Sequence, residues 1–447
     1  MKFENPDNSL FGFIRSERQD LLTGKSLRTY RHPCGLMIKF IPRPGFARKF
    51  AAVTVPYGSI HTEFIAGTEK FKVPAGSAHF LEHCVFSRDD GGGLLGKLSA
   101  LGASANAYTS HTHTLYYFSA VRHFDEALEL YLDSILSPYL ENDRVEAERP
   151  VILSELDQYR DDPETRCYNS LIENLFQKHP VREDIGGSAE TVRAITSDDL
   201  KTVWRHFYKP CRLSMTLAGD LDESHILERL DSRLKSYAGQ PTARAQLLLP
   251  EEPPMPLLPA FTLRMDVSTP SFLVGIKDPG ILPGHEITGR DLVARQRAAR
   301  LLLDTLISPV SALYDQLYSQ GLINDSFGFH YSCEENFAFL ACGGESNQPQ
   351  KAAAALKEGL ISHFSAGPDA NLFEIQKRAA AGDFVRSLDS VEHSGMVQAQ
   401  CNLHDIDLFD YPSIYDNIDA TAASATMSFL ADPACYSAAI LLPTEVT

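Results

Sequence analysis

The chain has 447 residues, of which 44% are hydrophobic, and it carries a formal net charge of −17 at pH 7. This length is too great for one ordinary core, so we expect two domains, and the hydrophobic content is enough to build both. The negative charge argues against nucleic acid and anionic membranes as partners and favours a cationic peptide or a basic protein. The sequence has no apolar run of membrane-spanning length and no apolar signal segment at residues 1–7, so we expect a soluble, cytoplasmic protein.

The first predicted elements are a strand over residues 49–55 and a helix that begins just after Ser77, which is its expected N-cap. This helix carries the motif His-x-x-Glu-His as His79, Glu82 and His83, and this order is the inverted form of a zinc-peptidase signature. The two imidazoles are four residues apart and share a helical face, so both are expected to bind zinc. Glu82 is then left for proton transfer.

A second helix and a strand follow the motif. The helix is predicted over residues 94–101 and ends at Gly102. Residues 104–120 alternate small, aromatic and hydroxyl side chains as a strand does, and the edge of such a strand can bind a peptide backbone. His111 and His113 fall on one face of this strand and could bind metal, but we prefer the interpretation that they form a polar, half-exposed face.

A catalytic zinc ion needs a third protein ligand. Cys84 follows the motif directly, but it points about 100° around the helix from its neighbour, so we interpret it as a buried hydrophobic residue. A predicted helix over residues 145–157 offers two carboxylates, Glu148 and Glu155, which are seven residues apart and share a face. One of them can bind zinc while the other orients the site, and the residues alone leave open which does which.

Proline crowds the region that divides the chain into two halves. We predict a zinc-bearing catalytic domain over residues 1–237, a proline-rich linker over 238–260 and a second domain over 261–447. The order of predicted elements repeats on both sides of the linker, so we expect an α+β protein made of two similar domains.

The second half repeats the elements but not the metal motif. A strand is predicted over residues 271–276, a helix around 298–307 and another helix that ends at Gly321. The stretch that corresponds to the motif helix is an ordinary apolar helix face without His-x-x-Glu-His. We therefore predict one zinc ion, Zn²⁺, per chain.

On these motifs the chain resembles the pitrilysin or insulinase family of zinc peptidases. The motif that contains His79 and His83 matches, and residues 148–155 match the family segment that ends in the third zinc ligand. The resemblance implies that Glu155 binds the metal and that Glu148 supports the site from beside it. It also implies two similar domains, each an antiparallel-rich sheet packed with helices, of which only the first binds metal.

The resemblance also extends to the predicted strand after Gly102, which matches the family pattern Gly-x-x-x-Asn-Ala-x-Thr. In the family this strand pairs with extended substrate beside the metal. The residues that are implied to bind substrate here are Ser104, Ala105, Asn106, Ala107 and Tyr108.

One departure from the family pattern lies in the second half. The family carries an Arg and a Tyr that hold a peptide carbonyl opposite the zinc, but Tyr318 and Asn324 stand at these positions here. The strong cationic donor is therefore missing. Since short chains of this family work in pairs, we expect a homologous second subunit, in a heterodimer, to supply the Arg/Tyr pair.

The expected function is that of a zinc-dependent endopeptidase that cuts peptides or unfolded segments, as the catalytic subunit of a two-chain enzyme. One alternative is a dedicated peptidase that removes the leader from a single precursor peptide. Another is a non-catalytic structural subunit of the same fold, against which the intact Glu82 and Glu155 argue. Residues alone do not name the substrate.

Overall fold

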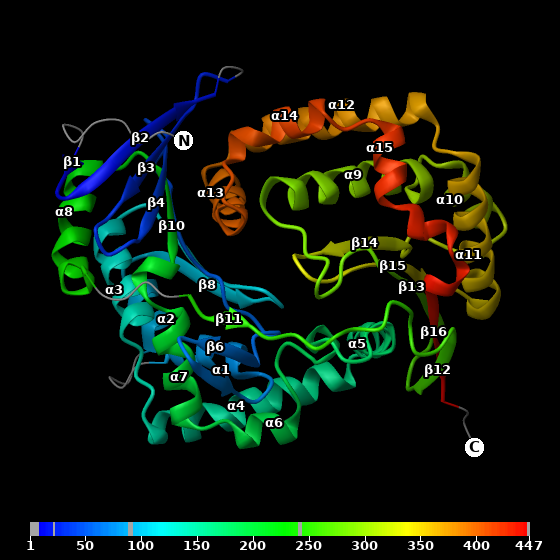
Figure 1. Ribbon diagram of the computed structural model, residues 1–447, viewed down its shortest axis with the longest axis horizontal. Coiled ribbons are helices and arrows are strands. Elements are labelled where there is room, and N and C mark those ends of the chain that lie inside the picture. The colour runs from blue at the N-terminus through cyan, green and yellow to red at the C-terminus, as the bar shows by residue number, and fades with distance from the viewer. Residues whose placement is uncertain (1–8, 21–22, 88–92, 240–243, 445–447) are drawn as a thin grey trace. The chain divides into compact units, whose positions relative to one another are not determined.

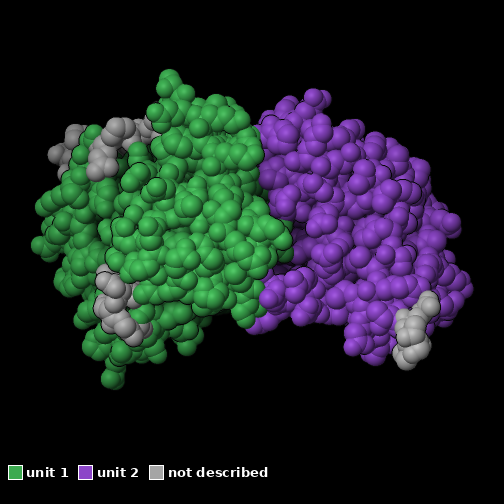
Figure 2. Space-filling view, turned by 90° about the horizontal axis from the view of Figure 1, so that it is seen from below, with its two compact units in different colours: residues 1–154, 184–248, 384–409 green, residues 155–183, 249–383, 410–447 purple. Residues whose placement is uncertain are grey.

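The structure is a computed structural model that describes residues 9–20, 23–87, 93–239 and 244–444 (Figure 1). The chain forms two compact units, which are coloured separately in Figure 2. Unit 1 comprises residues 1–154, 184–248 and 384–409, and unit 2 comprises residues 155–183, 249–383 and 410–447. Each unit contains a mixed sheet packed with helices, which confirms the predicted α+β class.

The main sheet of unit 1 has eight strands in the order β1-β2-β3-β4-β10-β5-β9-β8. Its strands are β1 (Ser9–Leu10), β2 (Phe13–Gln19), β3 (Ser26–Arg31), β4 (Met37–Pro42), β5 (Lys49–Val55), β8 (Ala103–Thr109), β9 (Thr114–Ala120) and β10 (Ser214–Gly219). Neighbouring strands are antiparallel except for the parallel pair β4 and β10. A small second sheet has the order β11-β6-β7, with β6 (Glu63–Ala66), β7 (Glu69–Lys72) and β11 (Gln246–Leu247).

The helices of unit 1 come from both halves of the sequence. They are α1 (Ser77–Phe86), α2 (Gly93–Ala100), α3 (Phe124–Leu136), the first part of α4 (Asn142–Asp161), α6 (Ala189–Ala194), α7 (Ser197–Phe207), α8 (Glu223–Leu234) and α13 (Val391–Cys401). Figure 1 shows α13, in orange, beside the main sheet of this unit, where it contacts β4, β5 and β10.

Both faces of strand β5 are buried. Residues 50–55 are all buried, so both faces of the strand must be covered. Helix α13 covers the face of Phe50 and Thr54. A Cβ added to Gly395 would come within 2.3 Å of the Phe50 ring, and Thr54 Oγ1 donates to the carbonyl of Ala399 at 3.1 Å. Helix α3 also packs against β5 and β9. The strand predicted at residues 49–55 is confirmed.

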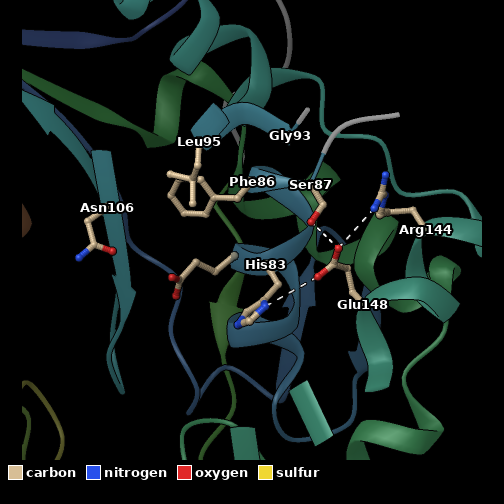
Figure 3. Close-up of a pocket in the computed structure, with 9 residues that line it drawn as sticks. His83, Phe86, Ser87, Gly93, Leu95, Asn106, Arg144 and Glu148 are labelled. Atoms are coloured by element: carbon tan, nitrogen blue, oxygen red, sulfur yellow. Dashed lines mark hydrogen bonds and ion pairs between the residues drawn. The ribbon is translucent and has the colours of Figure 1, made fainter. Parts of the chain in front are cut away.

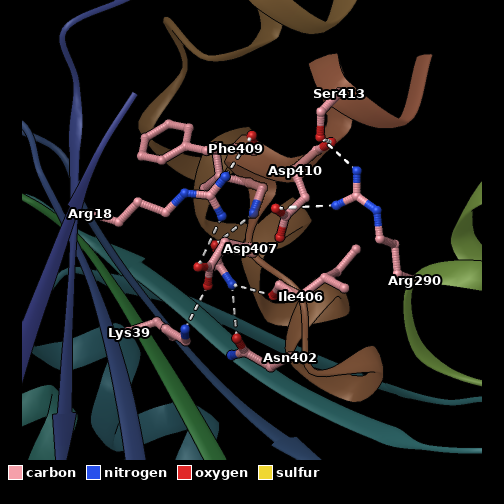
Figure 4. Close-up of polar contacts among 11 residues, drawn as sticks. Arg18, Lys39, Arg290, Asn402, Ile406, Asp407, Phe409, Asp410 and Ser413 are labelled. Carbon is pink, nitrogen blue, oxygen red and sulfur yellow. Dashed lines mark hydrogen bonds and ion pairs between the residues drawn. The ribbon is translucent and has the colours of Figure 1, made fainter. Parts of the chain in front are cut away.

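Polar contacts hold the segment after α13 in unit 1 (Figure 4). Asp407 accepts a hydrogen bond from Lys39 Nζ at 2.5 Å and another from Arg18 at 3.3 Å. Asn402 donates to the hydroxyl of Thr216 on β10 at 3.0 Å. Because Lys39 and Asp407 are both buried, losing either partner would leave an uncompensated charge, and this ties residues 384–409 to the sheet.

Unit 2 repeats the central part of unit 1. Its five-stranded sheet has the order β12-β16-β13-β15-β14, and β12 and β16 are its parallel pair. The order β4-β10-β5-β9-β8 of unit 1 corresponds strand by strand, including the parallel pair. The strands are β12 (Ala260–Met265), β13 (Ser271–Lys277), β14 (Gly328–Cys333), β15 (Ala338–Glu345) and β16 (Tyr436–Pro443). The predicted duplication is therefore visible in the topology.

The helices of unit 2 include one from the first half of the chain. They are the end of α4, then α5 (Pro163–Leu175), α9 (Gly289–Ile307), α10 (Ala312–Ser319), α11 (Pro349–Ala366), α12 (Ala370–Ser387), which crosses into unit 1, α14 (Tyr411–Asp416) and α15 (Ala420–Thr426). Helix α5 packs on β13 and β16, the counterparts of the strands that α13 covers in unit 1. Gly275 on β13 allows this approach, since an added Cβ would lie 2.8 Å from a methyl group of Leu171.

The compact units do not coincide with the predicted contiguous segments 1–237 and 261–447. Each unit takes one helical segment from the other half of the sequence, because each sheet needs a helix on a face that its own half leaves open. The chain does pass from unit 1 to unit 2 after Leu248, inside the predicted linker 238–260, of which residues 240–243 lie outside the described part.

Candidate metal centre

Helix α1 carries the motif, and it begins one residue earlier than predicted. Its N-cap is Gly76, with φ at 89°, and not Ser77, whose hydroxyl instead donates to the carbonyl of Pro74 at 2.7 Å. An added Cβ at Gly76 would come within 2.4 Å of the carbonyl oxygen of Gly186. A glycine is needed because of this close backbone approach, which involves residues far away in the sequence.

The structure brings the three predicted zinc ligands together. His79 and His83 lie one turn apart on α1, with ring centroids 4.7 Å apart. One nitrogen of each ring and one carboxylate oxygen of Glu155 converge on one point. The three ligand atoms lie within 4.8 Å of one another, and all three side chains are half-buried. Within the described ranges this is the one group of three or more such side chains that could hold a metal ion.

Helix α4 supplies the carboxylate from a rigid element. It runs unbroken over Asn142–Asp161 and includes Pro150, so Glu155 continues the same helix as Glu148. Tyr159, one turn further along, donates its hydroxyl hydrogen bond to Glu155 Oε1 at 2.9 Å. This contact was not predicted, although the spacing of four residues is a visible signal.

Glu148 lies beside the metal group and contacts His83 (Figure 3). Its Oε2 is 3.9 Å from His83 Nδ1, and its Oε1 accepts hydrogen bonds from Ser87 and, at 3.4 Å, from Arg144. The nearby imidazole of His83 is the main cause that lowers the pKa of Glu148 below its usual value, so this buried side chain stays a carboxylate. The predicted supporting position of Glu148 agrees with this geometry, and its role stays a prediction.

Cys84 is fully buried, as expected for a hydrophobic side chain. Burial, with a smaller contribution from the charge of Glu148, raises the pKa of its thiol to about 12. The thiol therefore stays protonated at neutral pH and is a poor metal ligand.

The strand predicted over residues 104–120 is in fact a hairpin. Strands β8 and β9 pair antiparallel and are joined by a turn at residues 110–113, closed by the bond from Ser110 N to the carbonyl of His113 at 2.8 Å. The prediction of one long strand is wrong because no Gly or Pro marks this turn. Instead the Ser110 hydroxyl accepts hydrogen bonds from the N–H groups of Thr112 and His113 at 3.3 and 3.2 Å.

His111 and His113 therefore do not form a half-exposed strand face. They sit in the turn, where Ser59 contacts His111 Nδ1 at 3.0 Å and the Ser110 hydroxyl contacts His113 Nδ1 at 2.9 Å. Burial lowers the pKa of each histidine to about 4. Both side chains are neutral at pH 7 and act in packing the turn.

Strand β8 is the last strand of its sheet, as a strand that pairs with a peptide should be. The side chains of Ser104 and Asn106 are exposed, while those of Ala105, Ala107 and Tyr108 are half-buried. Asn106 Oδ1 accepts a hydrogen bond from the N–H of Ala107 at 2.8 Å. Substrate binding by these residues stays a prediction.

Glu82 faces a cavity of about 510 Å³ next to the metal group. The cavity lies between α1 and β8, and Figure 3 shows its lining residues. They are Glu82, His83, Phe86, Ser87, Gly93, Leu95, Asn106, Arg144 and Glu148. Glu82 Oε2 accepts a hydrogen bond from Thr109 Oγ1 at 2.6 Å. Thr109 is the last residue of the matched Gly-x-x-x-Asn-Ala-x-Thr pattern, but its contact with Glu82 was not predicted. Ser87 and Arg144 were also missed; of these only Arg144, four residues before Glu148, has a local signal.

The two residues that stand in place of the family's Arg and Tyr have local contacts in unit 2. Tyr318, on α10, is 48% exposed and stacks on Tyr314, with ring centroids 5.8 Å apart. Asn324 Oδ1 accepts hydrogen bonds from the N–H and the hydroxyl of Ser326, as a turn residue does.

Comparison with known proteins places the chain in a family. Residues 52–188 match the family described as Insulinase (Peptidase family M16), and residues 194–380 match the Peptidase M16 inactive domain. The uncharacterized zinc protease YmfH of Bacillus subtilis is 32% identical over 390 residues, which cover 86% of this chain and 89% of that protein. The chain belongs to the insulinase family, peptidase family M16.

Other members of family M16 agree with this result. The crystal structure of an M16-like peptidase from Alicyclobacillus acidocaldarius superposes with a TM-score of 0.89 at 28% identity and covers 95% of this chain and 100% of that one. A probable mitochondrial-processing peptidase subunit beta of Arabidopsis thaliana is 26% identical over 261 residues, 56% of this chain and 47% of that protein. The relatives named zinc proteases support a zinc peptidase of this family.

The residues present fit zinc. Two imidazoles and one carboxylate, half-buried and converging on one point, are the donor set of a catalytic zinc site that keeps a position open for water. Across the part of the chain that the structure describes, none of the helices is both long enough and apolar enough to span a bilayer.

Proposed function

We propose that this chain is a zinc-dependent endopeptidase whose metal is held by His79, His83 and Glu155. The observation that carries the proposal is the convergence of these three side chains beside a cavity that Glu82 lines. One Zn²⁺ per chain is expected, since the described residues contain one such group.

Each side chain has a distinct task in the proposed reaction. A bound zinc ion supplies Lewis acidity, which polarises the scissile carbonyl and lowers the pKa of a coordinated water molecule. Glu82 accepts the proton of the attacking water and returns it to the leaving amine. Glu148 holds His83 in its binding orientation from behind.

The substrate is proposed to be an extended peptide or an unfolded segment. A peptide can add to the outer edge of β8 as one more antiparallel strand, with Ser104, Asn106 and their neighbours along it. Backbone pairing depends little on the side chains of the peptide, so we expect the enzyme to have a loose sequence preference for its substrates.

We further propose that a homologous subunit completes the active site, as the resemblance to processing peptidases suggests. The support is that Tyr318 and Asn324 are uncharged and have local contacts in unit 2, so neither supplies the cationic donor that the family uses. The named relative from Arabidopsis is itself a subunit of a processing peptidase.

The test is hydrolysis of a pool of unstructured peptides by the purified chain, with zinc content measured on the same sample. The chain is assayed alone and after mixing with any homologous chain encoded beside it. We expect about one zinc per chain and cleavage that appears or rises sharply on mixing. A zinc-loaded chain that is inert in every combination would instead favour a structural subunit.

A further inference from the structure

A short hydrogen bond joins helix α1 to strand β8. Oγ1 of Thr109, the last residue of β8, lies 2.6 Å from Oε2 of Glu82, and both side chains are partly buried. A hydroxyl that donates to a carboxylate at this distance makes one of the stronger kinds of hydrogen bond in proteins. The contact therefore restricts the orientation of Glu82.

The direction of the Thr109 hydroxyl proton follows from the contacts of the neighbouring Thr114 hydroxyl. Thr109 Oγ1 also lies 3.3 Å from Thr114 Oγ1, and Thr114 Oγ1 donates to the carbonyl of Tyr57 at 2.9 Å. A threonine hydroxyl has one proton, and both the carbonyl and the carboxylate can only accept. The proton of Thr109 is thus directed at Glu82.

Three buried tyrosines surround the same carboxylate, but their hydroxyl groups are engaged elsewhere. Those of Tyr116 and Tyr208 bind each other at 3.0 Å, and that of Tyr131 donates to two main-chain carbonyl groups at 2.8 and 3.1 Å. Burial raises the pKa of all three phenols, so they stay protonated and uncharged beside Glu82. The hydroxyl of Thr109, in contrast, donates directly to Glu82 Oε2.

We propose that Thr109 is a positioning residue for Glu82. The inference rests on the proposed function, because it assumes that Glu82 carries the proton. A base that takes a proton from water and returns it to an amine must keep one orientation through both steps. The bond to Oε2 sets the plane of the carboxylate relative to the cavity that Glu82 lines.

The position of Thr109 at the end of β8 extends this role. The preceding residues of the strand are those proposed to pair with the peptide. One strand then orients both the substrate backbone and the base, so a displacement of β8 would misplace the two together.

The test compares the Thr109→Val, Thr109→Ser and wild-type chains, each loaded with zinc and assayed with the homologous subunit present. Val keeps the shape of Thr and removes the hydroxyl, so we expect kcat to fall about 10- to 100-fold, with KM and zinc content unchanged. Ser keeps the hydroxyl and should restore kcat to within about threefold of wild type. Thr262→Val, the same change at an exposed position of β12, is the matched control and should leave kcat unchanged.

Wild-type kcat in Thr109→Val would overturn the proposal, as would equal losses in the Val and Ser variants, which would point to shape alone. Crystal structures of the same proteins give a second result that does not depend on turnover. We expect one Glu82 rotamer in wild type and Thr109→Ser, and more than one in Thr109→Val. A single unchanged rotamer in Thr109→Val contradicts the positioning role even if the wild-type chain cleaves no peptide, an outcome that would count separately against the proposed function.

Discussion

Tyr159 lies one helical turn beyond Glu155 and donates a hydrogen bond to Glu155 Oε1 at 2.9 Å. Glu148 lies near another proposed ligand, with its Oε2 3.9 Å from His83 Nδ1. Each contact restricts a proposed ligand to fewer orientations before a metal arrives. Such neighbours of ligands commonly strengthen metal binding, because less side-chain freedom is lost when the metal binds.

Replacing Tyr159 with Phe should therefore weaken zinc binding without abolishing it. We expect the dissociation constant to rise about tenfold, since the aromatic ring stays and only the hydroxyl is lost. Competition with a chelating dye measures the constant directly. Tyr139→Phe is the matched control, because its hydroxyl contacts Asp143 near the start of the same helix. Equal affinity in Tyr159→Phe and the control would show that the contact does not support the ligand.

At the scale of elements, the turn between β8 and β9 is built around neutral histidines. His111 and His113 lie in the turn, and burial lowers the pKa of both, and that of His61, to about 4. For His61 the charge of Arg212 adds to this lowering, and for His113 that of His404 does. Since the turn follows Thr109 directly, its stability affects the end of β8.

The turn should make the chain sensitive to acid. A histidine with a folded pKa near 4 and an unfolded pKa of about 6.5 stabilises the fold fully above pH 6.5, and this stabilisation is lost as the pH falls from 6.5 toward 4. We expect the melting temperature to fall across this range, and to fall less in His111→Gln, which keeps a polar partner for Ser59 but does not titrate. Thermal denaturation at pH 7, 6 and 5 measures both. Parallel curves for the two proteins would contradict this account.

The linker is held to unit 2 by a fully buried ion pair. Lys277 Nζ on β13 lies 2.5 Å from Glu252 Oε1, and neither side chain is exposed. Glu252 also accepts hydrogen bonds from the backbone N–H groups of residues 177–179. The carboxylate thus joins the linker, the segment after α5 and the sheet.

Lys277→Met should destabilise the protein by roughly 3–5 kcal/mol, because it leaves a buried carboxylate without its cation. The double variant Lys277→Met with Glu252→Gln removes the charge as well and should recover part of the loss. Denaturant unfolding of the three proteins measures the difference. A single variant as stable as wild type would show that the pair contributes nothing to holding the linker.

At the scale of the whole molecule, the duplication could be predicted from the sequence, but the exchange of helices could not. Strand β5 and the motif helix have local hydrophobic patterns that predict them well. The packing of α13 on β5, and of α5 on β13, depends on contacts such as Gly395 with Phe50. Local sequence patterns do not reveal such contacts between distant residues. The predicted domain boundaries therefore divide the chain into contiguous segments, whereas the compact units do not.

The same distinction holds at the site. His79 and His83 share a face as the motif predicted, and Glu155 lies beside them as the resemblance to the family implied. The hydrogen bond between Thr109 and Glu82 could not be predicted, since the two residues are 27 positions apart and the turn after Thr109 has no Gly or Pro. Rules for helix and strand periodicity describe neighbours on one element and do not extend to hydrogen bonds between elements.

The most direct test of the account is zinc content and peptide turnover measured together in Glu82→Gln and wild type, with the homologous subunit present. Gln keeps the size of the side chain but cannot accept the proton, so we expect about one zinc per chain in both proteins and at least a 100-fold loss of kcat in the variant. Turnover that persists in zinc-loaded Glu82→Gln would contradict the proposed mechanism, and so would loss of zinc from this variant.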